Sequence, residues 1–315
     1  MRKIKSGFEV LENRGSAALA SALFNLTRAS LQRTLFNCRY LCKKVNNYKM
    51  YLDLQDPGIS RSLILFGTRE LDHKIILEKV LAPGMRVFDI GANIGYYVLM
   101  EKSLIGDEGE IIAIEPSPSN IDLLKKNLKL NNQSKVTVLP GAVSSSSGNK
   151  KFFLAEHSNL NTFHPEGSAG QFMSGKTITV QTYTVSELAD KYGAPDLIRM
   201  DVEGHEVDVI YGMLDDIKNN KYKPMICFET HLSCYSKKND MAALLKQLFE
   251  NGYKTRYLSS SYERGTKLIN ERGYKGFGPI KTDSKERFLY ENLKPEDAID
   301  FISGVGGART VLLAP

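Results

Sequence analysis

Long apolar segments are missing from this 315-residue sequence: no run of about 18 apolar residues could span a lipid bilayer. The first residues, MRKIKSGFEV, lack the apolar centre and small-residue cleavage site of a signal peptide, so we expect a cytoplasmic protein. Cysteine is scarce, and Cys38, Cys42, Cys227 and Cys234 form no CxxC pair. This argues against a disulfide scaffold or a zinc site and favours reduced thiols.

The composition present is that of a soluble globular protein, with 42% apolar and 25% charged residues. The net charge of +6 is unevenly distributed. Residues 1–45 hold nine Lys or Arg against Glu9 and Glu12, a local charge of +7, which leaves about −1 for the rest. Because the basic excess stops near Asn46, it gives no support to nucleic-acid binding by the remaining domain.

Within this basic segment, apolar residues recur at helical spacing: Phe24, Leu31, Leu35, Cys38 and Cys42. The spacing predicts a basic amphipathic helix, and we assign residues 1–46 to a helical extension that precedes a domain over residues 47–315. Two interpretations of the helix stay open. It packs on the domain with its charges in water, or it contacts a membrane surface or an anionic partner.

The rest of the chain alternates between strand-like and helical segments. Strand-like runs lie at 86–90, 110–115, 135–139, 196–201, 224–229, 253–258 and 309–313. This alternation predicts an α/β fold, a mostly parallel sheet with helices on both faces. Two insertions, at about 149–182 and 260–305, interrupt it and should lie over the site or at the sheet edge. Ligands of such sheets bind beyond the carboxyl ends of the strands.

The stretch VFDIGANIGYYVLM combines an apolar strand with a turn that contains Gly91 and Gly95. Glycine allows a sharp turn and a close approach to a ligand. A dinucleotide motif, G-x-G-x-x-G, would need small residues where Asn93 and Tyr96 stand, so a nicotinamide or flavin cofactor is poorly supported. S-adenosylmethionine lacks phosphates and needs an acidic residue for its ribose hydroxyls, and Glu115 ends the next strand.

At this point the sequence resembles the FkbM-type S-adenosylmethionine-dependent methyltransferases. The resemblance rests on four segments between about residues 60 and 230: VFDIGANIGYYVL, GEIIAIEPSPSNIDLLKKNLKLNN, TITVQTYTVSEL and PDLIRMDVEGHEVDVIYGM. It implies a class I methyltransferase, Rossmann-like fold with seven strands, of which the last is antiparallel. The runs at 253–258 and 309–313 would be the sixth and seventh strands.

The resemblance also implies which residues bind S-adenosylmethionine. Gly91, Ala92, Asn93 and Gly95 would surround its methionine and ribose, Glu115 would bind the ribose, and Gly141 with Ala142 would border adenine. The full cofactor-binding set adds three residues of the same motifs: Asp89, Pro116 and Asp201. Gly141 departs from the polar side chain that many methyltransferases have there, which leaves adenine to backbone groups or to a neighbour such as Ser144.

Candidates for catalysis follow the fourth and fifth strands: Asp201, Glu203, Glu229 and His231. Methyl transfer from a sulfonium needs an aligned acceptor and removal of its proton. His231 is the better base by unperturbed pKa, whereas Asp201 could orient the acceptor hydroxyl or the cofactor amine. The four residue types would suit a divalent ion, but their spacing is not diagnostic, and we predict no metal.

The sequence after the fourth strand contains no D/N-P-P-Y, which many amino-group methyltransferases use there, and this favours a hydroxyl acceptor. Asn159, Asn161, Thr162 and His164 form a loop suited to a polyhydroxylated acceptor. We therefore predict O-methylation of a sugar, a glycan or another small hydroxylated metabolite. The alternatives are N-methylation of a peptide side chain, RNA methylation, and a non-catalytic binding or scaffold protein. The sequence does not predict an oligomeric state.

Overall fold

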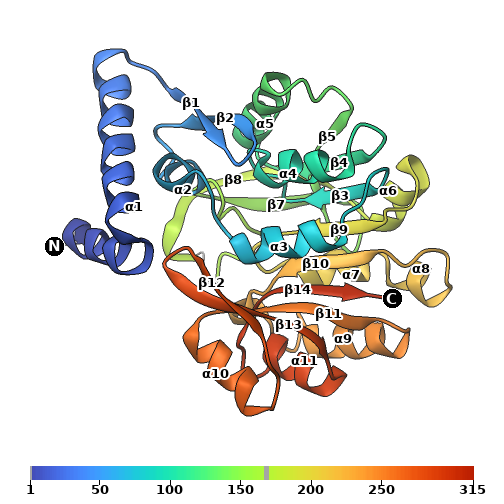
Figure 1. Ribbon diagram of the computed structural model, residues 1–315. Coiled ribbons are helices and arrows are strands. Elements are labelled where there is room, and N and C mark those ends of the chain that lie inside the picture. The colour runs from blue at the N-terminus through green and yellow to red at the C-terminus, as the bar shows by residue number, and fades with distance from the viewer. Residues whose placement is uncertain (1, 167–169) are drawn as a thin grey trace.

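The computed structural model describes residues 2–166 and 170–315, with side chains from Gly15 onward, and is built around one nine-stranded sheet (Figure 1). Along the sheet the order is β12-β13-β11-β14-β10-β9-β3-β4-β5. The strands in chain order are β3 (Arg86–Ile90), β4 (Glu110–Glu115), β5 (Val136–Pro140), β9 (Leu197–Met200), β10 (Met225–Glu229), β11 (Lys254–Ser260), β12 (Phe277–Thr282), β13 (Lys285–Leu293) and β14 (Ala308–Ala314).

The strand directions confirm the predicted fold class. The five strands β3, β4, β5, β9 and β10 run parallel to one another. The last strand, β14, runs antiparallel between β10 and β11. The central parallel strands β3, β4 and β9 are buried on both faces, as their nearly continuous apolar sequences require.

The expected count of seven strands is wrong, because the insertion at 260–305 adds two more. Its segments β12 and β13 form an antiparallel hairpin, and β13 pairs with the free edge of β11. The insertion thus extends the sheet edge (Figure 1). Its Gly, Lys and Ser content hides the strand signal, but Leu289, Tyr290 and Leu293 are buried and fix the hairpin on the domain.

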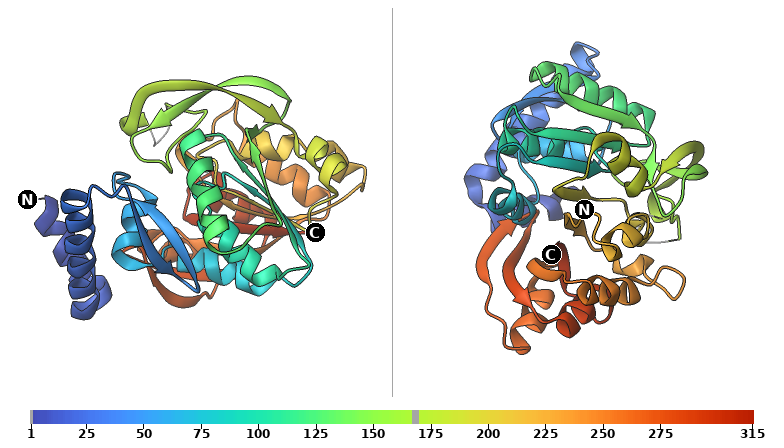
Figure 2. Two further views of the ribbon diagram at one scale, coloured as in Figure 1. Left: turned by 90° about the horizontal axis from the view of Figure 1, so that it is seen from above. Right: turned by 90° about the vertical axis from the view of Figure 1, so that its right-hand side faces the viewer.

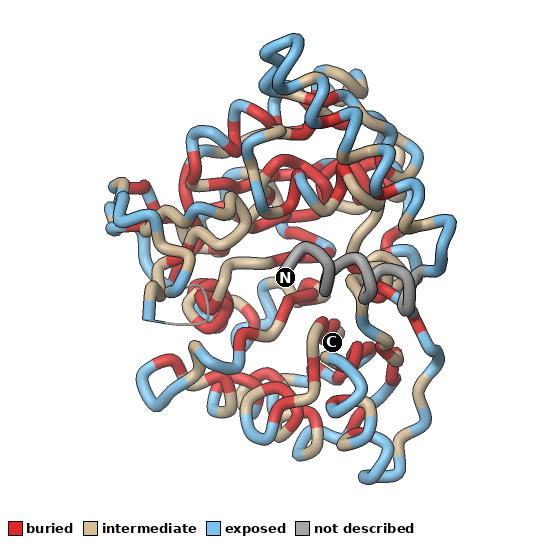
Figure 3. The backbone as a smooth tube through the Cα atoms, turned by 90° about the vertical axis from the view of Figure 1, so that its left-hand side faces the viewer, coloured by how far each residue is buried: buried red, intermediate tan, exposed pale blue. Residues whose placement is uncertain are grey.

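Two apolar cores hold the helices against the sheet, and Figure 3 shows the buried segments of the backbone in red. The first includes α2 (Ile59–Phe66), α3 (Leu71–Val80), α4 (Tyr96–Ile105) and α5 (Pro118–Leu130). The second includes α6 (Val185–Tyr192), α7 (Glu206–Tyr211), α8 (Leu214–Lys218), α9 (Met241–Glu250), α10 (Glu263–Glu271) and α11 (Pro295–Ser303). Helix α6 begins with a capping box in which Thr184 and Glu187 satisfy each other's backbone N–H groups.

The insertion at 149–182 forms a small sheet, as expected from its paired strand signals. Its strands are β6 (Ala142–Val143), β7 (Gly148–Ala155) and β8 (Met173–Tyr183), with β7 and β8 antiparallel. Figure 2 shows the long β7–β8 ribbon curving over one side of the molecule. Short 3₁₀ turns lie at Gly170–Phe172 and Leu232–Cys234.

The N-terminal region differs from the prediction. Helix α1 (Arg2–Leu35) is interrupted at Gly15, whose φ is +81°, and it ends before Cys38. Residues 40–53 form the antiparallel hairpin of β1 (Tyr40–Val45) and β2 (Tyr48–Asp53). Cys42 therefore lies on a strand, and the expected boundary at residue 46 falls in the hairpin turn. Burial of Leu41 and Val45 favours pairing with β2 over a longer helix.

Helix α1 packs on α2 and buries Ala22 and Ala29, while its predicted apolar face is exposed. The exposed fractions are 69% for Phe24, 48% for Leu31 and 70% for Leu35. No helix within residues 2–166 and 170–315 has the length and apolarity to cross a bilayer. None of the four cysteines, all of which lie in the described residues, forms a disulfide, and Cys227 is buried in β10.

Candidate active site

The turn between β3 and α4 is pressed against the ends of two neighbouring strands. The N–H groups of Gly91 and Ala92 both donate to the carbonyl of Ile114, at 2.9 and 3.0 Å. Gly91 has a φ of +79°, and a Cβ there would lie 2.3 Å from the backbone oxygen of Asp201. Only glycine can therefore hold the turn this close to β9.

Glu115 lies at the carboxyl end of β4, and one of its carboxylate oxygens binds the same turn. Its Oε2 accepts from the Asn93 N–H at 2.8 Å. Its Oε1 accepts from the Ser117 N–H at 2.9 Å and from the Asn120 amide at 3.2 Å. Burial raises the pKa of Glu115 to about 7, while these hydrogen bonds act in the opposite direction.

Glu115 and the turn line an enclosed space that we call the Glu115 cavity. One part of its wall is apolar: Ile114, Pro116, Ala142, Phe152 and Phe163. The rings of Phe152 and Phe163 meet edge to face, with centroids 4.9 Å apart. On the side toward β9 the wall is formed by Asp201, Val202, Glu203 and His205. The cavity thus combines an apolar slot with a carboxylate, as a nucleoside site requires.

The loop at 156–166 closes the Glu115 cavity on another side. The carbonyl of Ser158 accepts hydrogen bonds from the amides of Asn93, Asn120 and Asn161, at 3.2 to 3.3 Å. The buried Ser158 Oγ and Asn159 Oδ1 have no hydrogen-bond partner among the described residues. The loop therefore brings unpaired polar atoms to the cavity wall.

A second cavity, the Arg69 cavity, lies across the turn from the first. Asp201, Asn93 and Gly91 line both cavities, and Arg69, Glu70 and Tyr97 line only the second. Arg69 pairs with Glu70, which also accepts from the Tyr97 hydroxyl at 2.6 Å. Residues at 69–70 precede the first strand of the sheet, so this charge pair joins the N-terminal part of the domain to the site.

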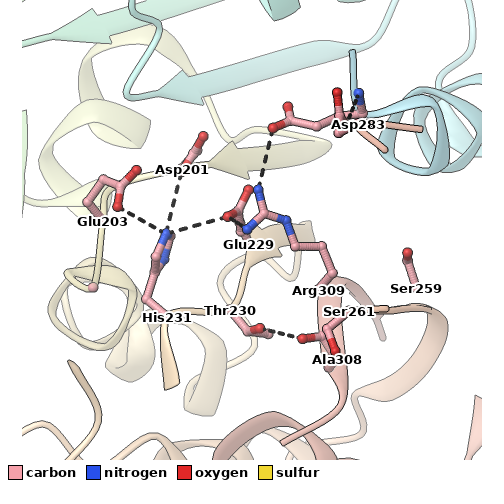
Figure 4. A network of polar contacts seen from close by, with 12 residues as sticks. Asp201, Glu203, Glu229, Thr230, His231, Ser259, Ser261, Asp283, Ala308 and Arg309 are labelled. Carbon is pink, nitrogen blue, oxygen red and sulfur yellow. Dashed lines mark hydrogen bonds and ion pairs between the residues drawn. The ribbon is translucent and has the colours of Figure 1, made fainter. Parts of the chain in front are cut away.

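Four side chains at the ends of β9 and β10 form what we call the acidic cluster: Asp201, Glu203, Glu229 and His231 (Figure 4). Two of them end or follow β9 and two end or follow β10, so adjacent parallel strands bring them together, as the sequence predicts. His231 Nε2 lies 3.4 Å from Glu203, 3.6 Å from Glu229 and 4.0 Å from Asp201. Arg309, from β14, forms an ion pair with Glu229.

Electrostatics in the acidic cluster are strongly coupled. Burial raises the pKa of Glu203 to about 8 and that of Glu229 to about 7, although His231 and Arg309 respectively oppose the shift. Burial alone would lower the pKa of His231, but Glu206, Glu203 and Glu229 raise it well above its usual value. The ring is therefore protonated at neutral pH unless a cation competes for Nε2, so an unperturbed pKa is a poor guide to its role.

Three residues predicted to bind the cofactor do not line either cavity. Asp89 is fully buried, and its carboxylate forms an ion pair with Arg199 at 3.1 Å beneath the turn. A Cβ at Gly95 would lie 2.5 Å from Leu124, so this glycine allows α4 to pack on α5. A Cβ at Gly141 would meet the backbone of β8. The motif fixes these positions through packing.

The other predicted cofactor residues line at least one cavity: Gly91, Ala92, Asn93, Glu115, Pro116, Ala142 and Asp201. Ser144, considered for adenine, instead bonds Lys150 and His205. In the loop expected to meet the acceptor, Asn159 and Asn161 line the Glu115 cavity, while Thr162 donates to the Glu203 carbonyl.

Sequence reasoning missed the aromatic wall and the basic partners. Phe152 and Phe163 belong to an insertion, where the only signal was a pair of apolar positions in a strand and in a polar loop. Arg309 lies on the last strand, and only the antiparallel insertion of β14 beside β10 brings it to Glu229. Its signal was a lone arginine at a strand start.

A sequence profile described as "Methyltransferase FkbM domain" matches residues 89–255, more than half of the chain. The chain belongs to the FkbM methyltransferase family. This confirms the resemblance found from the motifs, and the matched region contains the turn, Glu115 and the whole acidic cluster. S-adenosylmethionine is the cofactor that membership of this family implies.

Two curated relatives match shorter parts of the chain. Hexuronic acid methyltransferase AglP of Haloferax volcanii is 28% identical over 152 residues, 46% of this chain and 56% of AglP. Protein-L-isoaspartate O-methyltransferase 1 of Arabidopsis thaliana is 39% identical over 54 residues, 17% of this chain and 24% of that protein. This FkbM-family chain thus spans little more than half the length of AglP.

Solved structures align over more of the chain with low identity. Methyltransferase FkbM from Methylobacillus flagellatus has 15% identity and a TM-score of 0.40, covering 73% of this chain and 52% of that one. TYW2 of M. jannaschii, in complex with AdoMet, has 12% identity and a TM-score of 0.40, covering 88% and 86%.

The residues present fit S-adenosylmethionine. The Glu115 carboxylate can accept from two ribose hydroxyls, and the unpaired Ser158 Oγ and Asn159 Oδ1 offer further polar contacts. Phe152 and Phe163 give an apolar wall for adenine. The turn at 91–93, which lines both cavities, would hold the methionine part.

Glu115→Gln should weaken binding of S-adenosylmethionine by about 1–3 kcal/mol at pH 8, because charge-assisted hydrogen bonds to the ribose are lost. In the wild type the carboxyl is protonated below its pKa of about 7, so affinity should fall by about tenfold per pH unit below that point. Asp89 adds a smaller repulsive contribution to this pKa. Glu115→Gln should remove the pH dependence.

Calorimetry from pH 5.5 to 8.5 measures both effects. Glu110→Gln, at the exposed start of the same strand, is the matched control and should bind like the wild type. Unchanged affinity in folded Glu115→Gln would remove Glu115 from the cofactor site.

Proposed function

We propose that this protein transfers the methyl group of S-adenosylmethionine to a hydroxyl of a sugar, a glycan or another small hydroxylated metabolite. The observation that carries the proposal is the acidic cluster, whose Asp201 and Glu203 also line the Glu115 cavity. An acceptor bound there would have its oxygen beside both the cofactor and several groups able to take a proton.

The chain's own residues have three tasks in this reaction. Glu115 and the turn at 91–93 hold the cofactor, whose sulfonium supplies an electrophilic methyl group. Asp201, at the junction of the two cavities, orients the acceptor hydroxyl. The carboxylates behind it accept the proton as the oxygen–carbon bond forms and the carbon–sulfur bond breaks.

A carbohydrate acceptor draws support from AglP, which is named a hexuronic acid methyltransferase. The residues after β9, Asp201-Val202-Glu203-Gly204, do not form the D/N-P-P-Y of many amino-group methyltransferases. N-methylation of a peptide side chain, RNA methylation and a scaffold role are the competing functions.

Transfer of tritium from labelled S-adenosylmethionine into separated sugar and glycan, peptide and RNA fractions tests the proposal. Label in the sugar or glycan fraction, stable to mild acid and absent with Asp201→Asn, would support O-methylation. Label found only in the peptide or RNA fraction would contradict a sugar or glycan acceptor and favour peptide or RNA methylation. Cofactor binding without transfer to any fraction would favour the scaffold role.

We further propose that α1 contacts an anionic membrane surface, as a separable extension of residues 1–35. Its exposed Phe24, Leu31 and Leu35 lie on one face, opposite the buried Ala22 and Ala29. The surrounding segment carries a charge of +7, which complements anionic lipid headgroups. A cytoplasmic location is part of this proposal.

Replacing Phe24 and Leu31 together by Ser should reduce binding to phosphatidylglycerol vesicles by about tenfold or more, since two apolar side chains no longer enter the interface. Co-sedimentation measures this, and Phe277→Ser is the control, because Phe277 is also 69% exposed but lies on β12. Absence of vesicle binding by the wild type, or self-association that the double substitution abolishes, would contradict membrane contact.

A further inference from the structure

His231 is held in an unusual orientation inside the acidic cluster. Its side chain is only 7% exposed, and its Nδ1 lies 2.8 Å from the Oε1 of the fully buried Glu206. Its Nε2 makes no hydrogen bond to any residue that the structure describes, although it points into the cluster (Figure 4). A histidine that gives one nitrogen to a carboxylate presents the other as a ligand.

Three carboxylates face that Nε2. Their nearest oxygens are 3.4, 3.6 and 4.0 Å away, in Glu203, Glu229 and Asp201 respectively. These separations are too long for good hydrogen bonds. They are typical of ligand atoms that each lie about 2.0–2.2 Å from one shared metal ion.

Asp201 gives a second, independent indication. Its Oδ1 is fully buried and has no hydrogen-bond partner among the described residues. This oxygen lies 4.0 Å from His231 Nε2. An unpaired buried carboxylate oxygen is costly unless a cation or donor meets it. Arg309 pairs with Glu229, whereas Arg199 lies 3.5 Å from the other oxygen of Asp201, Oδ2, and leaves Oδ1 without a hydrogen-bond donor in the described part of the chain.

We infer that Asp201, Glu203 and His231 bind one divalent cation. Their ligand atoms lie within 4.8 Å of one another, and Glu206 fixes the ring of His231 as a positioning residue. Two carboxylates and one imidazole suit Mn²⁺ or a similar ion. This proposal departs from the prediction of no metal, which was made because the spacing in the sequence was not diagnostic.

The consequence for chemistry rests on the proposed function. An acceptor hydroxyl bound to the cation would lose its proton more easily, since the metal stabilises the developing alkoxide. The proton passes to Glu229 and then to water. The oxygen forms its bond to the methyl group as the bond from that methyl to sulfur breaks, which leaves a neutral thioether.

A second group of possible ligands, His164, His205 and Asp208, is a weaker candidate. Both ring nitrogens of His205 are already engaged, with His164 at 3.1 Å and with Ser144 at 3.0 Å. No ring nitrogen of His205 is left for an ion without breaking these contacts.

Titration of the metal-free full-length protein with Mn²⁺, followed by electron paramagnetic resonance and calorimetry, tests the inference without cofactor or acceptor. We expect one site in the wild type, and at least about tenfold weaker binding in Asp201→Asn and in His231→Ala. Glu206→Gln should cost about 10- to 100-fold, as loss of a partner that orients a ligand usually does. Thermal unfolding of each variant without metal checks that it is folded.

Glu250→Gln, which removes an exposed carboxylate at the end of α9, is the matched control and should bind as the wild type does. No Mn²⁺ binding below about 1 mM in the wild type would overturn the inference. So would a site that survives Asp201→Asn and is lost in His205→Gln. Either outcome leaves O-methylation to be judged by the tritium assay, so the two failures are distinguishable.

Discussion

His231→Ala is expected to lower the maximal rate of methyl transfer by about 100- to 10,000-fold and to leave the dissociation constant of S-adenosylmethionine nearly unchanged. The reason is position. His231 contacts three carboxylates of the acidic cluster and Glu206, but it lines neither the Glu115 cavity nor the Arg69 cavity. Its loss leaves carboxylates facing one another without the group that holds them.

Steady-state kinetics with the true acceptor and calorimetry with the cofactor measure the two quantities separately. Glu250→Gln, at the exposed end of α9 and outside the cluster, is the control and should keep the rate of the wild type. Wild-type turnover in folded His231→Ala would move the chemistry to Asp201, Glu203 and Glu229. If a chelator inhibits the wild type and Mn²⁺ restores its activity, the rate loss in His231→Ala would be assigned to the role of His231 as a metal ligand.

The central part of the fold could be predicted because each signal there is local. A buried parallel strand is a short apolar run, and the turn after β3 needs glycine where φ is positive, as at Gly91. Glu115 and the four residues of the acidic cluster follow strand ends, so the parallel arrangement alone brings them to one edge of the sheet. Five parallel strands and the cluster were therefore predictable together.

What the sequence did not reveal depends on contacts between distant segments. The hairpin of β12 and β13 is stable only on the free edge of β11, and Arg309 reaches Glu229 only because β14 is inserted antiparallel. The helical spacing from Phe24 to Cys42 misled because pairing with β2 competes with helix formation after Leu35. Secondary-structure propensity describes one segment by itself, whereas each of these features depends on a contact between two segments.

Asp89 shows the same limit at a single residue. The motif correctly marks it as special, but its carboxylate faces Arg199, which is 110 residues away in the sequence. Arg199 is itself buried in β9, close to the ring of Tyr97 at 3.9 Å and to Asp201 at 3.5 Å. One buried guanidinium thus connects the strand beneath the turn with the acidic cluster.

Arg199→Leu is therefore expected to reduce the free energy of unfolding by about 3–5 kcal/mol at pH 8, the cost of leaving a buried charge without its partner. Asp89 has no other ion-pair partner among the described residues, and its Oδ2 is already unpaired. Chemical denaturation measures the loss. Arg86→Leu, which breaks a pair with Glu110 at the exposed end of the sheet, should cost less than about 1 kcal/mol.

The pH dependence of this loss follows from the sign of the shift at Asp89. Burial already raises its pKa, and without Arg199 the folded-state pKa should rise further. A carboxyl that binds its proton more tightly when folded adds stability as the pH falls through its folded-state pKa toward its lower unfolded-state pKa. The difference between wild type and Arg199→Leu should therefore shrink from pH 8 to pH 5. Asp89→Asn added to Arg199→Leu should recover part of the stability at pH 8, whereas a constant difference across the pH range would show that lost packing, not buried charge, sets the cost.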